Sequence, residues 1–362
     1  DVEASLVSYA TRYPAFDLLS VYEHLANNKK LNKGQPFSSC SSSTSSMGWD
    51  DIIGQTQAKR ALTIAAAGSH NLLMVGPQGT GKSLLASRLL ALLPPMTEQE
   101  ALEVASIHSV KGENLNVERF LKRHMRSPHH TSSAVALTGG GSQPVPGEIS
   151  LAHNGVLFLD ELPEFGRRAL DVLREPLETG DVHISRAMAS ATYPANFQLI
   201  AAMNPSPTGD IDDNRLTPQQ QLSYLNRLSG PLLDRIDIQV EVPRLASYDL
   251  SPPVNSKSDS MLEARDNVLR AREVQLHRQG KPNAQLAAGE LADLCQLTDS
   301  DLRFLQAAAK QLNLSMRVFH RTLKVARTLA DLSEQPTVTR AHLAEALGYR
   351  ALDTLIKQLS SQ

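Results

Sequence analysis

Residues 71–85, NLLMVGPQGTGKSLL, constrain the fold of this chain more strongly than any other segment. The apolar run at residues 72–75 predicts a buried strand, and the apolar spacing of residues 84–93 predicts a helix. Between them lies the pattern G-x-x-x-x-G-K-S. A glycine loop between a strand and a helix turns its backbone N–H groups towards nucleotide phosphates. The sequence therefore predicts an α/β fold that binds a nucleoside triphosphate.

Each part of this loop has an expected task. Lys82 is expected to reach the β- and γ-phosphates, and the Ser83 hydroxyl is expected to bind Mg²⁺. The positive end of the following helix adds to the attraction for phosphate. A glycine-rich turn without a ligand is the alternative, but its glycines would then cost chain entropy for no gain. The expected ATP-binding residues of the loop are Gly76, Pro77, Gln78, Gly79, Thr80, Gly81, Lys82, Ser83 and Leu84.

Polar residues also follow two other predicted strands. Residues 155–159 are apolar and end at Asp160 and Glu161, as expected for a buried parallel strand with ligands at its carboxyl end. Asp160 would hold Mg²⁺ through water, and Glu161 would polarise the attacking water. The alternative is a strand that leaves the sheet in a charged turn. The predicted strand at residues 197–202 leads to Asn204, which would orient the water or the γ-phosphate.

The segment before the loop is a further candidate for nucleotide contact. Ile53 and Gly54 precede a predicted helix at residues 56–67, at the position that closes over adenine in many ATPases. A helix that only packs on the sheet is the alternative.

Composition limits the remaining choices. The net charge of −2 means that any nucleic-acid contact must come from a local patch, and the aromatic content of 4% argues against stacking as its main mode. Only Cys40 and Cys295 are present, so neither a disulfide framework nor a thiolate metal site is predicted. A cytoplasmic compartment is expected, with no signal peptide and no membrane span. The start at Asp1 suggests a fragment.

The order of patterns predicts four regions. Residues 1–46 are expected to hold one short helix, the end of a larger domain, and a serine-rich linker; residues 47–245 form the nucleotide-binding core. Residues 246–260, rich in Pro and Ser, are a second linker, and residues 261–362 form a separate all-α domain. One helix each is expected at residues 167–177, 261–278, 287–297, 300–312, 315–331 and 339–358.

Several cations are candidates for contact with DNA phosphates. Lys122, Arg123 and Arg126 belong to a basic cluster that is as readily a solvated helix face. Arg186 is expected near the tip of a hairpin at residues 182–193, and an ordinary surface hairpin is the alternative. Arg235 is not among these candidates for DNA contact. It lies at a predicted helix end between two acids, where a local ion pair of little energetic weight is the alternative to a functional role.

These residues together resemble the AAA+ superfamily of P-loop NTPases, and within it the magnesium-chelatase-like branch known as the ComM/YifB family. The similar stretches are residues 49–83, 129–134, 147–165, 229–237 and 323–331. The resemblance implies a parallel sheet flanked by helices, followed by an all-α lid. It also implies a ring-forming ATPase, hexameric when active, that uses ATP and Mg²⁺ and acts as a DNA helicase in branch migration during natural transformation.

By position in the family motifs, Asn204 resembles sensor 1, and Arg235 resembles an arginine finger that reaches a neighbouring subunit's nucleotide. Arg317 resembles the sensor 2 arginine of the lid. The loop at residues 139–147 and the hairpin around Arg186 resemble the pore-facing insertions of this branch.

The chain departs from the family pattern in two places. The Lon-like N-terminal domain that relatives carry is represented only by its expected tail, and Ser206, Pro207 and Thr208 stand where many relatives have cysteines, so no zinc is predicted there. Two other functions stay open. One is an ATP-driven remodeller of a protein partner, as in magnesium chelatases, although no D-x-S-x-S metal-binding motif is found. The other is a passive nucleotide-dependent scaffold, against which Glu161 and Arg235 speak.

Overall fold

The computed structural model describes residues 10–34, 48–49, 51–113, 120–141, 144–185, 189–209, 216–244, 261–312 and 314–360. The chain divides into two compact units. The first comprises Asp1–Ser45 and Pro95–Arg123, and the second comprises Ser46–Pro94 and His124–Gln362. Each is described by itself.

Among its described residues, the first unit contains two helices with well-formed N-termini. Helix α1 (Leu18–Leu25) lies within the predicted segment, and the Asp17 carboxylate accepts a hydrogen bond from the backbone N–H of Ser20. Helix α4 (Glu98–Lys111) begins with a capping box that Thr97 and Glu100 form. Its apolar residues belong to a small buried cluster of Met96, Ala101, Val104, Ala105 and Phe120.

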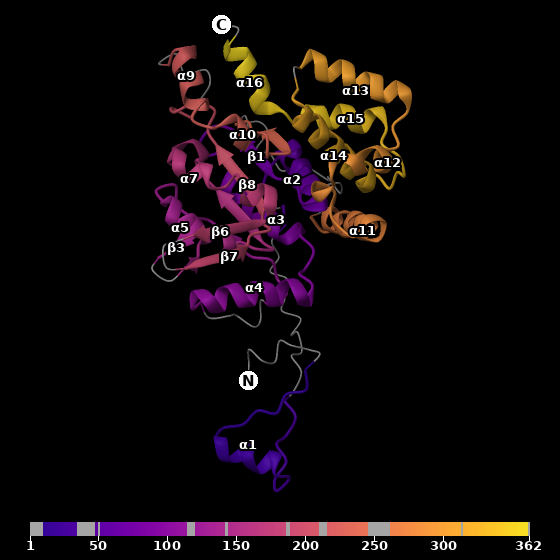
Figure 1. The fold of residues 1–362 in the computed structure, drawn as a ribbon. Coiled ribbons are helices and arrows are strands. Elements are labelled where there is room, and N and C mark those ends of the chain that lie inside the picture. The colour runs from indigo at the N-terminus through magenta and orange to yellow at the C-terminus, as the bar shows by residue number, and fades with distance from the viewer. Residues whose placement is uncertain are drawn as a thin grey trace. The chain divides into compact units, whose positions relative to one another are not determined.

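The second unit is built on a five-stranded parallel sheet of order β2-β5-β8-β1-β9. The three strands predicted from apolar runs are present, and their side chains are almost entirely buried because helices cover both faces (Figure 1). Leu72 of β1 pairs with Ile200 of β8 on one side and Ile238 of β9 on the other. The strands are β1 (Leu72–Val75), β2 (Met125–Arg126), β5 (Val156–Leu159), β8 (Gln198–Met203) and β9 (Ile238–Glu241). The predicted α/β class is confirmed.

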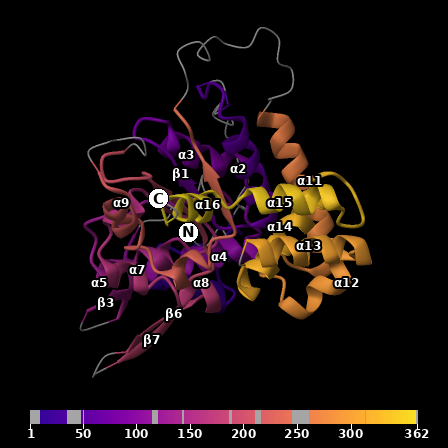
Figure 2. The same ribbon diagram turned by 90° about the horizontal axis from the view of Figure 1, so that it is seen from above.

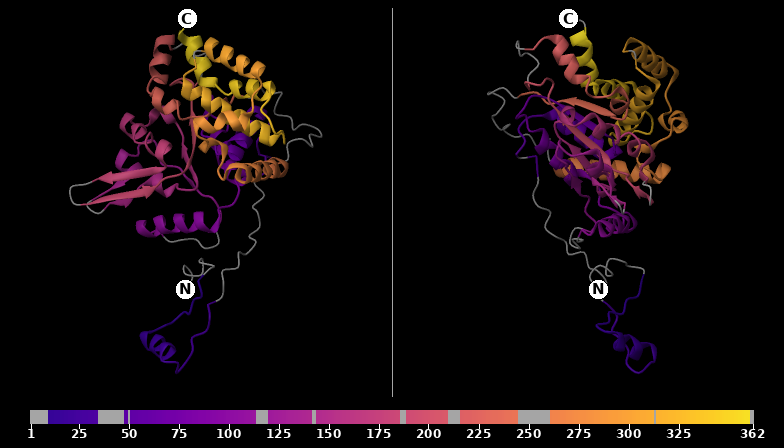
Figure 3. Two further views of the ribbon diagram at one scale, coloured as in Figure 1. Left: turned by 45° about the vertical axis from the view of Figure 1, so that its right-hand side comes forward. Right: turned by 60° about the vertical axis from the view of Figure 1, so that its left-hand side comes forward.

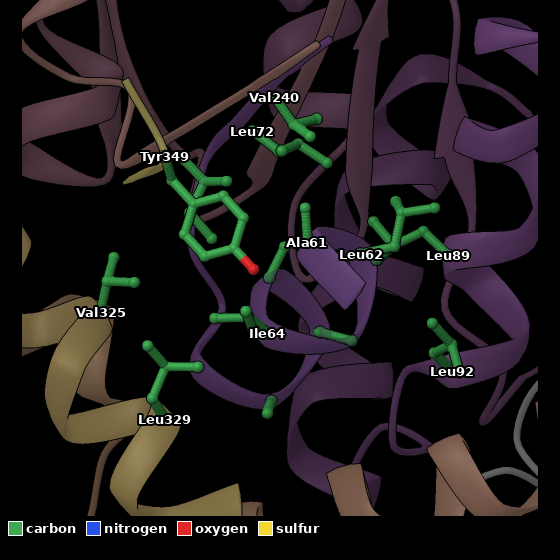
Figure 4. Close-up of a cluster of buried hydrophobic side chains, with 14 of the residues drawn as sticks. Ala61, Leu62, Ile64, Leu72, Leu89, Leu92, Val240, Val325, Leu329 and Tyr349 are labelled. Atoms are coloured by element: carbon green, nitrogen blue, oxygen red, sulfur yellow. The ribbon is translucent and has the colours of Figure 1, made fainter. Parts of the chain in front are cut away.

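One face of the sheet carries α2 (Thr56–Gly68) and α3 (Lys82–Leu92). Alanine-rich α2 is buried almost throughout because helices α11 (Met261–Gln279) and α14 (Met316–Leu332) pack on its outer side. Figure 4 shows this core, with side chains from α2, α3, the sheet, α14 and the residue after α15 meeting in one cluster: Ala61, Leu62, Ile64, Leu72, Leu89, Leu92, Val240, Val325, Leu329 and Tyr349. The nucleotide-binding core and the helical region therefore share one hydrophobic core.

Short elements cover the opposite face, where the prediction of one helix at residues 167–177 is wrong. The structure has α7 (Arg167–Asp171) and α8 (Pro176–Thr179) instead. Pro176 has no N–H to donate, and its ring clashes with a preceding carbonyl, so the first helix ends before it. Gly180 ends α8 at a φ of 78°, the left-handed conformation that favours glycine at a helix end. The same face carries α5 (Ala134–Thr138), α6 (Glu148–Leu151), α9 (Pro218–Leu225) and α10 (Gly230–Leu233).

The helical region gathers α11, α12 (Leu291–Cys295), α13 (Asp299–Gln311), α14 and α15 (Arg340–Gly348), as Figure 2 shows from above. Residues 287–297 are not one α-helix, since a 3₁₀ turn at Ala288–Glu290 precedes α12. A buried ion pair joins Arg327 to Asp331, one turn later in α14, at 2.8 Å.

The prediction of one helix over residues 339–358 is also wrong. After α15 the chain runs beside the sheet, where the N–H of Gln239 donates to the carbonyl of Tyr349, and α16 (Ala351–Ser360) then begins. The Gln239 side chain accepts from the N–H of Leu352 at 3.1 Å. Leu352, Leu355 and Leu359 of α16 are buried in the core of the sheet's second face. The last helix therefore packs on the nucleotide-binding core.

The predicted hairpin is present as β6 (Asp181–Ser185) and β7 (Ser190–Pro194), an antiparallel pair that projects beyond the sheet in Figure 3. Its tip, including Arg186, lies outside the described residues. A second small pair, β3 (Gly139–Gly140) and β4 (Val145–Pro146), lies in the predicted glycine-rich loop. Among the described helices, none has the length and apolar character needed to cross a membrane.

Candidate nucleotide-binding site

The predicted site residues meet at one edge of the sheet. The glycine loop follows β1, Asp160 and Glu161 follow β5, and Asn204 follows β8. These three strands are parallel neighbours in the order β5-β8-β1, so their carboxyl ends lie side by side. In open α/β sheets this edge is where ligands bind.

The glycine loop has the backbone that its sequence requires. Gly79 and Gly81 have φ angles of 79° and 85°, which side chains disfavour, and α3 begins directly after Gly81. Gly76 is needed for another reason, since a Cβ there would lie 2.1 Å from the carbonyl oxygen of Val242 on the neighbouring strand segment. The loop is thereby held close to the sheet, with the N-terminus of α3 at its end.

Lys82 is the buried centre of the loop. Its ammonium donates to the carbonyls of Gly76 at 2.7 Å and Pro77 at 2.8 Å and to Asn204 Oδ1 at 3.1 Å. Burial lowers the pKa of Lys82, and the charges of Asp160 and Glu161 offset part of this effect. Two residues 122 positions apart, Lys82 and the sensor 1 candidate Asn204, are therefore in direct contact.

Ser83 and Asp160 form the candidate Mg²⁺ position. Ser83 Oγ donates to Asp160 Oδ2 at 2.6 Å, and the N–H of Glu161 donates to Asp160 Oδ1 at 2.9 Å. A hydroxyl and a carboxylate beside a phosphate-binding loop are the oxygen ligands that Mg²⁺ takes, together with phosphates and water. The residues present therefore fit Mg²⁺ bound with a nucleoside triphosphate.

The carboxylate of Glu161, the candidate base, has a partner that the sequence did not indicate. The backbone of Glu161 is left-handed, with a φ of 53°, and its carboxylate lies 3.0 Å from His130 Nδ1. The His129 ring lies against that of His130 in a tilted arrangement, with centroids 4.1 Å apart and an interplanar angle of 34°. Both histidines follow β2, the neighbour of β5, so the strand order brings them to Glu161. The histidine pair was part of the family resemblance, but its spacing gave no signal of this contact.

The segment before α2 has an unusual backbone at the predicted adenine position. Gly54 and Gln55 have φ angles of 61° and 53°, and Ile53 is half-buried. Gln55 Nε2 donates to the carbonyl of Pro243 at 2.8 Å, which ties this turn to the chain after β9. A contact of Ile53 and Gly54 with adenine remains a prediction.

Arg235 has a different partner from the acids that flank it in sequence. Its guanidinium pairs with Glu178, at the end of α8, and donates to the carbonyl of Pro231 at 2.7 Å. The flanking Asp237 pairs instead with Arg321 of α14. Arg235 thus does form an ion pair, as the alternative interpretation had it, but with Glu178 and not with an acid that flanks it in the sequence. Arg317, the sensor 2 candidate, is exposed on the first turn of α14.

The expected helix face of the basic cluster is wrong for the described part, residues 120–126. Arg126 lies in strand β2 and makes a two-point ion pair with Glu148, at 2.7 and 2.8 Å. Arg123 donates to Glu100 at 3.0 Å, within the first unit, and Lys122 is exposed. Carboxylates thus already neutralise Arg123 and Arg126. The roles of these residues and of Arg186 in binding DNA remain predictions.

Comparison with known proteins decides the family. Residues 48–250 match the model of magnesium chelatase, subunit ChlI, and residues 258–350 match that of its C-terminal part. The chain is also 52% identical to competence protein ComM of Haemophilus influenzae over 99% of its own length and 72% of that protein. It belongs to the magnesium-chelatase-like ComM/YifB family. This membership implies ATPase activity, and AAA+ proteins of this kind generally use ATP and Mg²⁺.

Two further relatives show how far the similarity of this ComM/YifB chain extends. It is 52% identical to YifB of Escherichia coli over 85% of its own length, but spans only 61% of that protein. It is 28% identical to the magnesium-chelatase 38 kDa subunit of Rhodobacter capsulatus, with 81% and 83% of the two chains covered. The family resemblance read from the sequence is thus confirmed.

Proposed function

We propose that this protein hydrolyses ATP at the interfaces between subunits of a ring. The observation that carries the proposal is the meeting of Lys82, Ser83, Asp160 and Asn204 at one sheet edge, with contacts of 2.6–3.1 Å. When bound, Mg²⁺ neutralises charge on the phosphates. In the proposed site Lys82 binds phosphate, Ser83 and Asp160 hold the metal ion, and Glu161 orients the attacking water with Asn204.

The ring is proposed because the family resemblance implies a hexamer and because Arg235, by its position in the family motif, resembles an arginine finger that serves a neighbouring subunit. Arg235 is bonded to Glu178 on its own chain, and we propose that it acts on the nucleotide of a neighbouring subunit. An arginine supplied in trans is worth about 10³ to 10⁵ in rate. We propose a hexamer with one such contact at each interface between subunits. Isolated subunits should therefore hydrolyse ATP poorly.

The test of this assignment is multi-turnover ATPase of the assembled Arg235→Ala protein, with Arg227→Ala as the matched control. Arg227 lies on the same segment and makes an exposed ion pair with Glu164 at 3.3 Å. Arg235→Ala should lower the rate by about three orders of magnitude or more, and Arg227→Ala should leave it nearly unchanged. Normal hydrolysis by assembled Arg235→Ala would refute the assignment.

We further propose that hydrolysis drives movement along DNA, as a helicase in branch migration during natural transformation. Support comes from the 52% identity to a competence protein and from the projecting β6–β7 hairpin, whose tip carries Arg186. Because Arg123 and Arg126 already pair with carboxylates, we assign DNA contact first to Arg186, which the sequence places between the two strands of this hairpin. Binding through phosphate contacts should weaken steeply with salt and depend little on sequence.

The experiment measures ATPase with and without forked DNA, and strand displacement with Glu161→Gln as the inactive control. Stimulation and displacement that both fall with salt are expected. An ATPase that DNA neither binds nor stimulates would remove the DNA proposal and leave the ATPase proposal intact.

The second candidate is an ATP-driven remodeller of a protein partner. The observation in its favour is the 28% identity to a magnesium-chelatase 38 kDa subunit, which extends over both the core and the helical region. ATPase stimulation by a protein partner, with none by forked DNA, would favour this candidate.

A further inference from the structure

We propose that Arg321 is a positioning residue: it ties helix α14 to the backbone of Arg235, so that nucleotide bound in one subunit sets the finger used by the next. This inference rests on the proposed function of Arg235. It concerns a group of contacts behind the finger, away from the phosphate-binding loop.

The carbonyl oxygen of Arg235 is held by two side chains from distant parts of the chain. Asn71 Nδ2, just before β1, donates to it at 2.9 Å, and Arg321 Nη1 donates to it at 3.0 Å. Asn71 is itself fixed, since its Oδ1 accepts from the N–H of Leu199 in β8 at 2.9 Å. The finger's backbone is therefore fastened to the sheet on one side and to α14 on the other.

Asp237 strengthens the connection to α14. It is buried, pairs with Arg321, and accepts from the N–H of Asn71 at 3.0 Å. Burial by itself raises the pKa of this carboxyl, but the Arg321 charge, the contact with His70 and the Asn71 N–H outweigh it and lower the pKa. Asp237 is thus an anion that holds Arg321 in place next to the Arg235 carbonyl.

A second chain of contacts joins Asp237 to α14, two helical turns after Arg321. His70 Nδ1 lies 3.5 Å from Asp237 Oδ2, and His70 Nε2 lies 2.7 Å from Thr328 Oγ1. The packing there is tight, because a Cβ on Gly68 would lie 2.2 Å from the His70 ring. Helix α14 therefore contacts Asp237 directly through Arg321 and indirectly, by way of His70, through Thr328. A movement of the helix should therefore move Asp237 with it.

The same helix also carries the sensor 2 candidate. Arg317 and Arg321 are four residues apart, so they lie on one face of α14, about 6 Å apart along the axis. Arg317 is exposed, and among the described residues it has no ion-pair or hydrogen-bond partner. One arginine is thus available to the subunit's own nucleotide, while the other holds the finger for the neighbour's nucleotide. A shift of α14 on nucleotide binding would move both.

The test compares Arg321→Met and Arg321→Lys with Arg270→Met, whose arginine makes an exposed ion pair with Glu334 on the same helical region. Assembly, affinity of the isolated subunit for ATP, kcat and the Hill coefficient of ATP hydrolysis are measured. We expect both Arg321 variants to keep subunit affinity and assembly, to lose about 10- to 100-fold in kcat, and to show a Hill coefficient near 1. Arg321→Lys keeps a charge beside Asp237, so it remains informative if Arg321→Met does not fold.

Combination with Arg235→Ala separates positioning from a general structural role. In that background Arg321→Lys should cause no further loss of kcat, since both changes disable the same finger. Additive losses, a parallel loss of nucleotide affinity, or an unchanged kcat with intact cooperativity would each overturn the inference. If Arg235→Ala itself leaves hydrolysis intact, the proposed function fails first.

Discussion

Replacement of Asp237 by Ala should destabilise the fold more than any other single change of a charged residue near the finger. The carboxylate is 3% exposed and pairs with Arg321, whose side chain is 22% exposed. Its loss leaves that guanidinium mostly buried without its anion and leaves the N–H of Asn71 without an acceptor. Breaking a buried ion pair on one side costs 3–5 kcal/mol; because Arg321 keeps some contact with water, we expect about 3 kcal/mol.

The assay is thermal and urea unfolding of the wild type, Asp237→Ala and the control Asp234→Ala. A loss of about 3 kcal/mol should lower Tm by roughly 6–12 °C for a domain of this size. Asp234 flanks Arg235 on the other side, is half-buried, and has no side-chain hydrogen bond among the described residues, so its replacement should have little effect. Equal, small effects of both substitutions would refute the reasoning.

The dependence on pH supplies an independent check. The pKa of Asp237 in the folded protein lies below its ordinary value of 3.8, so the unfolded chain takes up this proton first as the pH falls. The contribution of Asp237 to stability is therefore complete above about pH 5 and is lost as the pH falls through about 4 and below. The difference between wild type and Asp237→Asn should shrink over that range. A difference that stays constant down to pH 3 would contradict this account.

Three other substitutions test the site and its surroundings. Gly76→Ala should cost several kcal/mol of stability or prevent folding, because its Cβ would lie 2.1 Å from the Val242 oxygen; calorimetry against Gly166→Ala, where nothing lies within 4 Å, checks this. Ser83→Ala should retain nucleotide binding without Mg²⁺ and lose most of the Mg²⁺-dependent gain, which calorimetric titration measures. Arg126→Ala should lower the free energy of unfolding by about 1–2 kcal/mol, because the ion pair between Arg126 and Glu148 is lost. It should leave the salt dependence of DNA binding unchanged.

The sequence predicted the site residues that lie on strand ends, because apolar runs mark parallel strands and the polar residues that follow them must meet at one edge. Asp160 and Asn204 were placed in this way, whereas Lys82 and Ser83 were placed by the glycine-loop motif; the structure brings all four together. Helix breaks were predicted less well. The interruption at Pro176 had a local signal, but the one at Arg350 depends on a contact with Gln239 of β9, more than one hundred residues earlier.

Ion-pair partners were the least predictable feature. Arg235 has acids on both sides in sequence, yet it pairs with Glu178, 57 positions away, and Asp237 pairs with Arg321. The partner of each charged residue depends on which side chains the packing of α8 and α14 brings close. The spacing of charges along the sequence does not predict it. The same holds for His130 at Glu161, which only the order of β2 and β5 explains.

Subunit mixing tests the central claim, a site shared between neighbours, most directly. Glu161→Gln and Arg235→Ala are each prepared as assembled, inactive proteins, mixed in equal amounts, reassembled and assayed for ATP hydrolysis. In a closed ring with head-to-tail contacts, about a quarter of the interfaces would join an intact Glu161 to an intact Arg235 from the neighbour. The account predicts that the mixture recovers activity far above either variant alone. A mixture as inactive as its components would show that both residues serve one site within one chain, and would contradict the account.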